Sequence, residues 1–452
     1  MKEKRYLKTW QYFTFTGGNV GMAMPTNFIS SFIIFFYSSF YMGLDVGIIG
    51  TLMLMAKLFD GVSDIIFGNI MDRCSHPMGK AKPWVLRGAI PLGITGILLF
   101  FLPNSGGWVP YAFFFLFYVL YNAVFYTMTN LAYNSMFALV TTSSAEVVKM
   151  NSIGYVIVML VNILINAGTL GLVKALGNDI AAWRITMIIY TTVGVILLII
   201  SMLTVKELSS EELGVEETPE EEVASFKENL KSAVKNPYYG WAILFNLFNN
   251  LVITGSTGLL LYFCQINLGD INIYSSLSAV YMFAIIPLLF VSPALVRKFS
   301  VYKVNLISSL IMLILSVAAI PAGMSGNTTV FYVLFCLRFV PMGALMPSTM
   351  AILPSVVEYS RIQTGKRLEG ILYSSASIGY KLAAGIGSAM PGWILAAIGY
   401  SASATVQSER AVNGMAAFFY GLPVVIGIIM LVVYYKLDVE KGIERLKKEK
   451  GM

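Results

Sequence analysis

The sequence predicts an all-α membrane protein whose twelve transmembrane helices form two similar halves. Of its 452 residues, 57% are hydrophobic and only 12% are charged, whereas a soluble domain carries about 25% charged residues. Apolar runs longer than about 18 residues recur along the chain, and each is long enough to cross the hydrocarbon core. Backbone polar groups in lipid must be satisfied internally, so these runs predict helices. A hydrophilic stretch separates six runs from six more.

The apolar runs give the helices in chain order. Those of the first half are expected at 9–40, 46–71, 84–103, 108–140, 147–177 and 181–205. Those of the second half are expected at 238–268, 272–295, 301–323, 329–354, 368–399 and 410–435. The chain is therefore divided into an N-terminal six-helix bundle at 1–205, a linker at 206–237, a C-terminal six-helix bundle at 238–436 and a tail at 437–452. The linker is either a surface-bound amphipathic helix or a solvated tether.

Positive charge predicts the orientation in the membrane. Most of the 31 Lys and Arg residues fall on the side of the N-terminus, and the opposite side holds only Lys174, Arg184 and Arg410. Cytoplasmic loops collect Lys and Arg. We therefore expect a multi-pass protein of the bacterial inner membrane with both termini, the linker and the tail in the cytoplasm.

The second predicted helix carries charges at membrane depth. Lys57, Asp60 and Asp64 follow one another at i, i+3 and i+7, which places them on one stripe of a helix. Such charges usually face a cavity or a partner because exposure to lipid is costly. Two carboxylates one turn apart suit a small hard cation or a proton relay. The alternative is a structural ion-pair network with Lys57 or Lys381.

Two further charges lie inside predicted helices of the second half. Lys381 follows a stretch of small residues in the eleventh helix and is a candidate counter-charge for an empty cation site. Arg338, in the tenth helix, either contacts a substrate or reaches toward the membrane interface. Three positive charges against two negative ones favour an acidic substrate such as a hexuronide.

Polar and aromatic residues inside the helices resemble those that bind sugars, since amides bind hydroxyl groups and aromatic rings cover C–H faces. Singly, each Asn could equally bond a neighbouring helix. Together they predict a substrate site, whose candidate residues are Asn19, Asn27, Tyr126, Asn130, Tyr133, Asn134, Asn250, Arg338, Tyr373 and Tyr380.

The same composition argues against other classes of protein. The lone His76 falls in a loop, and the three cysteines lack metal-ligand spacing. An intramembrane enzyme would need a nucleophile–base pair or a metal set, so we expect no catalytic residues and no cofactor. The formal charge of +7 lies at helix ends, as membrane topology predicts, and does not indicate nucleic acid.

Two motifs identify a family. The first is Lys57-Leu58-Phe59-Asp60-Gly61-Val62-Ser63-Asp64, followed by Gly68 to Arg73 and then Met78-Gly79-Lys80-Ala81-Lys82-Pro83-Trp84. The second runs from Glu358-Tyr359 through Thr364-Gly365-Lys366-Arg367 to Glu369-Gly370. A weaker third match is Asn130 to Ser135. The chain resembles the melibiose permease-like glycoside–pentoside–hexuronide:cation symporters of the major facilitator superfamily.

The resemblance implies two pseudo-symmetric six-helix bundles that carry a sugar, glycoside or hexuronide by alternating access. Asp60 and Asp64 would bind Na⁺, H⁺ or Li⁺, with Lys57 and Lys381 as charge partners. The cytoplasmic gate would contain Asp72, Arg73, Gly79, Lys80, Glu358, Lys366 and Arg367. The expected partners are a small-molecule sugar and the bilayer, and we expect a functional monomer.

The chain also departs from the family pattern. Asn130 stands where a sugar-binding carboxylate is expected in helix four, and an arginine expected in helix five is replaced near Gly154. No Asp or Glu occurs in the first helix. These changes argue against recognition of α-galactosides. The alternatives are a cation-coupled carrier of an amphiphile such as a lysolipid, or a sugar sensor on a transporter scaffold.

Overall fold

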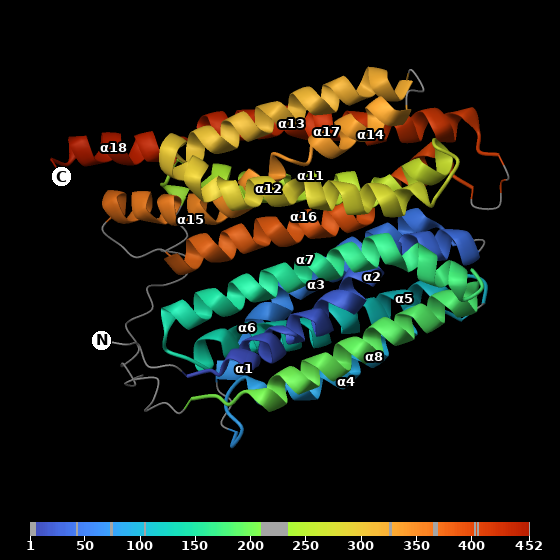
Figure 1. Cartoon of the computed structure of the whole chain (residues 1–452), viewed down its shortest axis with the longest axis horizontal. Helices are drawn as coiled ribbons and strands as arrows, with labels where there is room; N and C mark the ends of the chain where they lie inside the picture. The colour runs from blue at the N-terminus through green and yellow to red at the C-terminus, as the bar shows by residue number, and fades with distance from the viewer. Residues whose placement is uncertain are drawn as a thin grey trace. The chain divides into compact units, whose positions relative to one another are not determined.

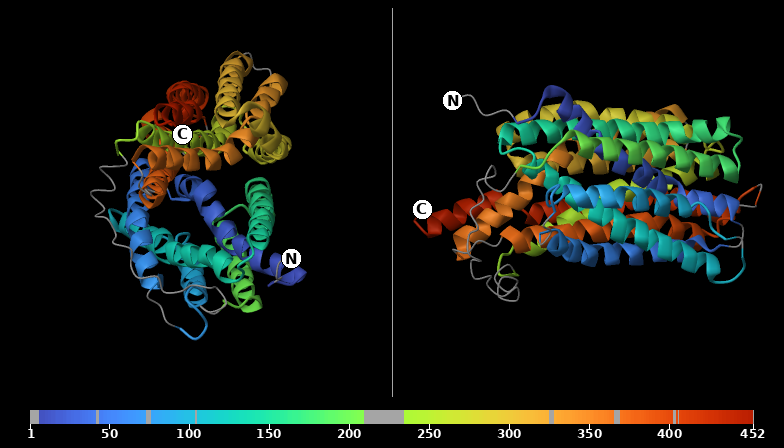
Figure 2. Two further views of the ribbon diagram at one scale, coloured as in Figure 1. Left: turned by 90° about the vertical axis from the view of Figure 1, so that its left-hand side faces the viewer. Right: turned by 90° about the horizontal axis from the view of Figure 1, so that it is seen from below.

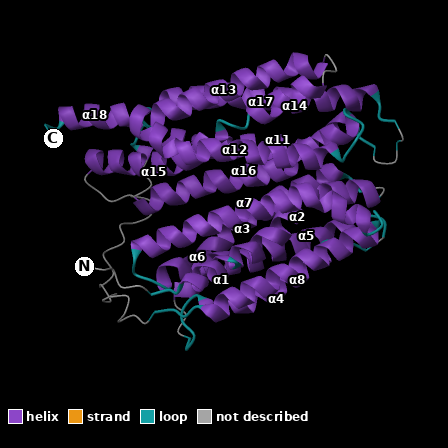
Figure 3. Cartoon of the chain, viewed as in Figure 1, coloured by secondary structure: helices purple, strands orange, loops and turns teal. Residues whose placement is uncertain are grey.

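The computed structural model describes residues 6–41, 44–72, 76–103, 105–208, 234–324, 328–364, 369–401, 404 and 406–451. Within these ranges all regular secondary structure is helical (Figure 3). The chain divides into two compact units, Met1–Pro219 with Ser401–Thr405, and Glu220–Tyr400 with Val406–Met452. Each unit is described by itself. Most of the predicted linker, 209–233, lies outside the described residues.

Unit 1 contains the six segments predicted for the first half. The first segment is bent into two helices, and the fourth contains a π-helix, η1, between two α-helices (Figure 1). The helices are α1 (Thr9–Thr16), α2 (Gly18–Phe40), α3 (Val46–Asp72), α4 (Lys82–Leu98), α5 (Val109–Val119), η1 (Leu120–Tyr126), α6 (Thr127–Leu139), α7 (Ser144–Ala175) and α8 (Ile180–Thr204).

Unit 2 contains the other six segments and a helix in the tail. The tenth segment is interrupted at residues 338–341, between α14 and α15. The helices are α11 (Tyr239–Ile266), α12 (Ile273–Phe299), α13 (Val301–Met324), α14 (Thr328–Leu337), α15 (Met342–Thr364), α16 (Glu369–Ile398), α17 (Glu409–Lys436) and α18 (Val439–Glu449). Figure 2 shows from two further sides how the helices of each unit run side by side.

Eleven helices within the described residues are long and apolar enough to cross a membrane. The remaining predicted segment, the third at 84–103, is α4, whose 17 residues lie at the short end of the range of about 17–25 that spans a bilayer. Side-chain caps fix several helix starts, because the first N–H groups of a helix lack internal partners. Asp179 accepts from the N–H of Ala182, and Ser408 accepts from that of Ala411.

The two units repeat one packing pattern. In unit 1, α2 packs on α8 and α7, α4 packs on α8 and α6, and α3 packs on α5. In unit 2, α11 packs on α17 and α16, α13 packs on α17 and α14, and α12 packs on α15. Each of these contacts in unit 1 joins segments that hold the same places in chain order as the segments joined by the matching contact in unit 2. Internal repeats of this kind are common in membrane transporters.

Small residues bring the central helices of each unit close together. At Gly21 of α2, a Cβ would collide with the carbonyl oxygen of Gly194 in α8. At Gly387 of α16, it would collide with Thr254 of α11. Membrane helices associate largely through such close packing, since lipid supplies no hydrophobic drive between them. Aromatic clusters fill the remaining space, with Trp183 at the centre of the cluster in unit 1.

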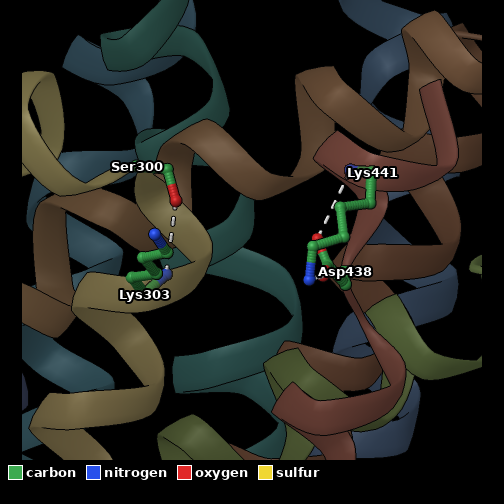
Figure 4. A network of polar contacts seen from close by, with 4 residues as sticks. All are labelled: Ser300, Lys303, Asp438 and Lys441. Carbon is green, nitrogen blue, oxygen red and sulfur yellow. Dashed lines mark hydrogen bonds and ion pairs between the residues drawn. The ribbon is translucent and has the colours of Figure 1, made fainter. Parts of the chain in front are cut away.

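Helix α18 extends the second unit beyond α17 and packs against α15 (Figure 1). The Asp438 carboxylate lies 2.8 Å from Lys441 Nζ at the start of the helix (Figure 4). Nearby, Ser300 joins α12 to α13 with a positive φ of 72°, and its hydroxyl accepts from the Lys303 N–H. Lys450 Nζ donates to the carbonyl oxygens of Ile362 and Gln363 in the last turn of α15.

Candidate functional site

Helix α3 carries the charged stripe that the sequence predicts. Asp60 is 9% exposed, and Lys57 and Asp64 are half-buried one turn to either side of it. Helix α3 lies against α5, η1 and α6. The stripe therefore belongs to unit 1, and its partners come from the fourth membrane segment.

Asp60 is bound by a hydroxyl group that the sequence analysis missed. Thr127, the first residue of α6, is 2% exposed, and its Oγ1 donates to Asp60 Oδ1. The same hydroxyl lies 3.1 Å from the carbonyl oxygen of Asn122. A buried carboxylate needs such partners, because an unpaired charge at this depth is costly. The site thus contains carboxylate, hydroxyl and main-chain oxygens.

Lys57 also finds a partner in the fourth segment. Its Nζ donates to Asn122 Oδ1 at 2.8 Å, and Asn122 Nδ2 donates to the Tyr118 carbonyl oxygen at 3.1 Å. Asn122 lies in η1, a π-helix of seven residues. π-Helices are rare and often occur at functional sites. Sequence periodicity gave no sign of this π-helix.

These groups can hold a small hard cation or a proton. Sodium and related ions prefer oxygen ligands, and two carboxylates one turn apart also favour sharing of a proton. Within the described part of the chain, no cluster of three or more His, Cys, Asp or Glu side chains has metal-binding geometry. A cation at α3 would therefore be held by two carboxylates together with hydroxyl or main-chain oxygens.

Lys381 lies in α16 of unit 2 and is half-buried. The predicted partnership of Lys381 with the α3 carboxylates joins two separate units, and it stays a prediction.

The predicted substrate residues of unit 1 occupy different environments. Asn19, Asn27, Tyr126 and Asn130 are half-buried, and Asn134 is exposed. Asn134 Nδ2 donates to Asn130 Oδ1 at 3.3 Å. A Cβ at Gly154 would lie 2.7 Å from Asn19 Nδ2. The absence of a side chain at 154, noted as a departure from the family pattern, thus leaves room for the amide of Asn19.

Tyr133 serves as a packing residue. It is fully buried, its ring stacks on Phe15 with centroids 5.2 Å apart, and its hydroxyl donates to the Phe15 carbonyl oxygen at 2.6 Å. These contacts hold α1 against α6. The single hydrogen of the Tyr133 hydroxyl is therefore used inside unit 1. For this reason we leave Tyr133 out of the proposed substrate site.

In unit 2, the predicted substrate residues lie on α11 and α16. Asn250 is half-buried, and its Nδ2 donates to the Asn246 carbonyl oxygen at 2.9 Å. That bond uses the amide nitrogen along its own helix. Tyr380 is 54% exposed. The side chain of Tyr373 lies outside the described residues.

Arg338 lies at the break between α14 and α15 and is 4% exposed. Its guanidinium carbon is 4.6 Å from the ring centroid of Phe335, 5.0 Å from that of Phe339 and 5.7 Å from that of Phe419. Its Nη2 has no hydrogen-bond partner among the described residues. Aromatic rings thus surround the guanidinium group within unit 2, and the choice between a substrate contact and the membrane interface stays a prediction.

The predicted gate turn at Gly79 is bound by Glu207, which the sequence analysis did not single out. The Glu207 carboxylate accepts the N–H groups of Lys80, Ala81 and Lys82 at 2.7, 3.0 and 2.6 Å. These groups precede or begin α4, where free N–H groups and the helix dipole favour a carboxylate. Gly79 has a φ of 109°, and a Cβ there would collide with Glu207.

The structure describes only some of the other predicted gate residues. Glu358 forms an exposed ion pair of 3.1 Å with Arg361, one turn along α15. Arg73, Lys366 and Arg367 lie outside the described residues, as does the side chain of Asp72 at the end of α3. Their roles in a gate stay predictions.

A second carboxylate, Glu146, ties the N-terminal segment to α7. Glu146 is 7% exposed and accepts from the Tyr12 hydroxyl at 2.6 Å, the Thr141 hydroxyl at 2.7 Å and the N–H groups of Tyr6 and Leu7. Burial by itself raises the pKa of Glu146, but the four donors outweigh it and hold the pKa below its usual value. The carboxylate is therefore stabilised in its charged form.

Comparison with known proteins identifies the family. The family model described as MFS/sugar transport protein matches residues 14–441. The chain belongs to this family. It is a member of the glycoside–pentoside–hexuronide:cation symporters of the major facilitator superfamily, as the motifs predicted. Membership makes the chain a secondary active sugar symporter that works by alternating access, and not an enzyme.

Similar members of the family cover nearly the whole chain. The putative glycoside/cation symporter YagG of Escherichia coli K12 is 29% identical over 89% of this chain and 86% of its own. The isoprimeverose transporter of Lactiplantibacillus pentosus is 24% identical over 94% of this chain and 88% of its own.

Solved structures confirm the major facilitator fold. A bacterial homologue of the human lysosomal transporter Spinster has a TM-score of 0.70 at 15% identity, covering 97% of this chain and 98% of that one. The D-xylose–proton symporter has a TM-score of 0.64 at 12% identity, covering 94% and 97%.

Proposed function

We propose that this symporter carries a sugar or glycoside together with Na⁺ or H⁺, and that Asp60, Asp64 and Thr127 hold the coupling cation. The observation that carries the proposal is the buried Asp60 carboxylate with the Thr127 hydroxyl bound to it at membrane depth. A charge at that depth is energetically costly, and charges that occur there usually mark an ion or substrate pathway. Li⁺ would occupy the same oxygen ligands.

The cation and the sugar act together through the fourth membrane segment. Thr127 at the cation site and Asn130 at the proposed sugar site are less than one turn apart on α6. Ion binding at Thr127 therefore acts on the helix that presents Asn130. The proposed sugar contacts are Asn19, Asn27, Tyr126, Asn130 and Asn134 in unit 1, and Asn250, Arg338 and Tyr380 in unit 2.

The names of the relatives suggest which substrates to test. They include isoprimeverose, lactose and sulfoquinovose. The buried Arg338 guanidinium, which lacks a partner at Nη2 among the described residues, supports including an acidic sugar. We further propose that the protein acts as a monomer in the bacterial inner membrane, with both termini in the cytoplasm.

The test is ligand-dependent thermal stabilisation of the purified protein. The panel contains isoprimeverose, lactose, sulfoquinovose, a hexuronide and a lysolipid, each with and without Na⁺ and at several pH values. A ligand that binds only the folded state at about 100 times its Kd stabilises it by roughly 2.7 kcal/mol. We expect a sugar to raise Tm more in the presence of Na⁺ or at lower pH.

Variants of the α3 carboxylates test whether Asp60 and Asp64 couple sugar binding to the cation. Asp60→Asn and Asp64→Asn are expected to remove the dependence of sugar binding on Na⁺ or pH. Glu449→Gln, at the exposed end of α18, serves as a control in which one carboxylate outside the membrane segments is removed. Sugar binding and uptake that keep their full cation dependence in both Asp variants would disprove the proposal.

A further inference from the structure

Helices α13 and α17 of unit 2 pack on each other and present exposed apolar stripes (Figure 1). On α13 the stripe consists of Ile307, Leu310, Ile311, Ile314 and Val317. On α17 it consists of Val425, Ile428 and Val432. An exposed apolar stripe on a membrane-spanning helix contacts the acyl chains of lipids, because the bilayer core holds no water. We call these two stripes together the α13–α17 face.

Each stripe ends in an exposed lysine at the same end of unit 2. Lys303 lies one turn before Ile307 on α13, and Lys436 lies one turn after Val432 on α17. Glu440, just beyond α17, accepts the first N–H of α13 at 3.2 Å. The start of α13 therefore lies beside the end of α17, and the two lysines belong to one end of the α13–α17 face.

Tyrosine rings accompany the positive charges at this end. Lys436 Nζ lies 5.9 Å from the ring centroid of Tyr435, which is 69% exposed and follows Val432 on the same stripe. Lys441 Nζ, from the start of α18, lies 5.6 Å from the ring centroid of Tyr302. Tyrosine is enriched where a membrane helix meets the lipid headgroups. The lysines therefore lie at the level of the headgroups.

Positive charge exceeds negative charge around this end of the face. The nearby carboxylates are Asp438, paired with Lys441 at 2.8 Å (Figure 4), and Glu440, bonded to the start of α13. The last turn of α12 adds exposed Arg297 and Lys298, and neither α12 nor α13 contains an Asp or Glu. Membrane topology explains why lysines lie on this side of the membrane. It does not require them to end two adjoining apolar stripes.

We propose that the α13–α17 face binds an anionic phospholipid. Lys303, Lys436 and Lys441 hold its phosphate group, and its acyl chains lie along the two apolar stripes. Lysine binds phosphate as a point charge, and basic clusters at the ends of membrane helices bind anionic headgroups. The site shares no residue with the proposed cation and sugar contacts. It therefore does not rest on the proposed function.

The experiment titrates the purified full-length protein in a non-ionic detergent. The probes are a short-chain phosphatidylglycerol, a phosphatidylcholine with the same chains, and glycerol phosphate. The measured quantity is the probe concentration that gives half of the maximal thermal stabilisation. We expect phosphatidylglycerol to act at the lowest concentration. Equal action of phosphatidylcholine would overturn the selection of an anionic headgroup, and equal action of glycerol phosphate would overturn the assignment to a lipid.

A double variant tests the residues of the site. Lys303→Gln/Lys436→Gln is expected to need roughly 30-fold more phosphatidylglycerol, at about fivefold for each lysine removed. Lys447→Gln/Lys448→Gln is the matched control, because it removes the same charge from exposed positions in the last turn of α18. An unchanged affinity in the first variant, or an equal loss in both, would overturn the inference.

Further variants guard against a loss of folding. Lys303→Arg/Lys436→Arg keeps both charges and is expected to bind phosphatidylglycerol like the wild type. If Lys303→Gln/Lys436→Gln fails to fold, the single variant Lys303→Gln carries the test, with an expected loss of about fivefold. Weak binding in the Arg variant, or unchanged binding in Lys303→Gln, would contradict the inference.

Discussion

At the scale of single residues, two buried carboxylates organise the loops of unit 1. Glu207 accepts three consecutive N–H groups at the start of α4, and Glu146 accepts four donors from the N-terminal segment and the loop before α7. Charge-assisted hydrogen bonds of this kind are stronger than neutral ones. The turn before α4 and the N-terminal segment therefore each depend on a side chain that lies far away in the sequence.

Gly79 provides the first prediction. Gly79→Ala is expected to lower Tm, because the residue has a φ of 109° and the added Cβ would collide with Glu207. Gly107→Ala is the matched control, since Gly107 also has a positive φ, 77°, but no atom within 4 Å of its Cβ position. Both variants bear backbone strain of about 1–2 kcal/mol. Equal Tm losses would show that the contact with Glu207 contributes nothing.

Glu146 predicts a pH dependence of stability. Its pKa is lowered in the folded state, so its contribution is fully present above the unfolded-state value, about 4.5, and is lost as the pH falls through the folded-state pKa. The free energy of unfolding is therefore expected to differ between the wild type and Glu146→Gln by a constant amount at pH 6–8, and by less below about pH 4.5. Chemical denaturation of both proteins over a pH series measures this difference in the free energy of unfolding. A difference that keeps its full size down to pH 3 would contradict the prediction.

At the scale of helices, α18 acts as a cap on the second unit. Lys450 donates to two carbonyl oxygens in the last turn of α15, where the helix dipole favours a positive charge. At its other end, Glu440 accepts the first N–H of α13 at 3.2 Å. The tail at 437–452, for which the sequence analysis predicted no helix, thus contains a helix that packs within unit 2.

Removal of this cap gives a third prediction. Lys450→Met is expected to lower Tm, because the carbonyl oxygens of Ile362 and Gln363 lose their charged donor. Lys448→Met, an exposed lysine in the same turn, removes the same charge and serves as the control. Thermal unfolding of both variants measures the difference. The cap has no stabilising role if the two variants melt together.

At the scale of the whole molecule, the prediction concerns topology. Both termini are expected in the cytoplasm, because Lys and Arg gather on that side. A fluorescent protein fused after residue 452 should fluoresce in the cytoplasm. Alkaline phosphatase fused after Leu176 should be active, because that loop is expected on the opposite side of the membrane. The reverse pattern of activities would exclude this orientation.

The sequence by itself determined the class, the helices and the charged stripe of α3. All three depend on patterns local to the chain: apolar runs of membrane length, and side chains three or four residues apart that share a helix face. The predicted ends of the membrane segments agree with the helices to within five residues, apart from α15, which runs ten residues beyond the predicted 354. The break at Arg338 and the π-helix escaped detection, because both are local departures from α-helical geometry.

Only the tertiary structure decided which groups meet. Thr127 and Asp60 are 67 residues apart, Asn122 and Lys57 are 65 apart, and Glu207 lies 125 residues from Lys82. Such contacts depend on how each helix is rotated and how deep it lies against its neighbour, which hydropathy does not specify. The wider turn of η1, whose hydrogen bonds span five residues and not four, changes that rotation for every residue after it. For this reason the carboxylates of the site could be predicted from the sequence, and their partners could not.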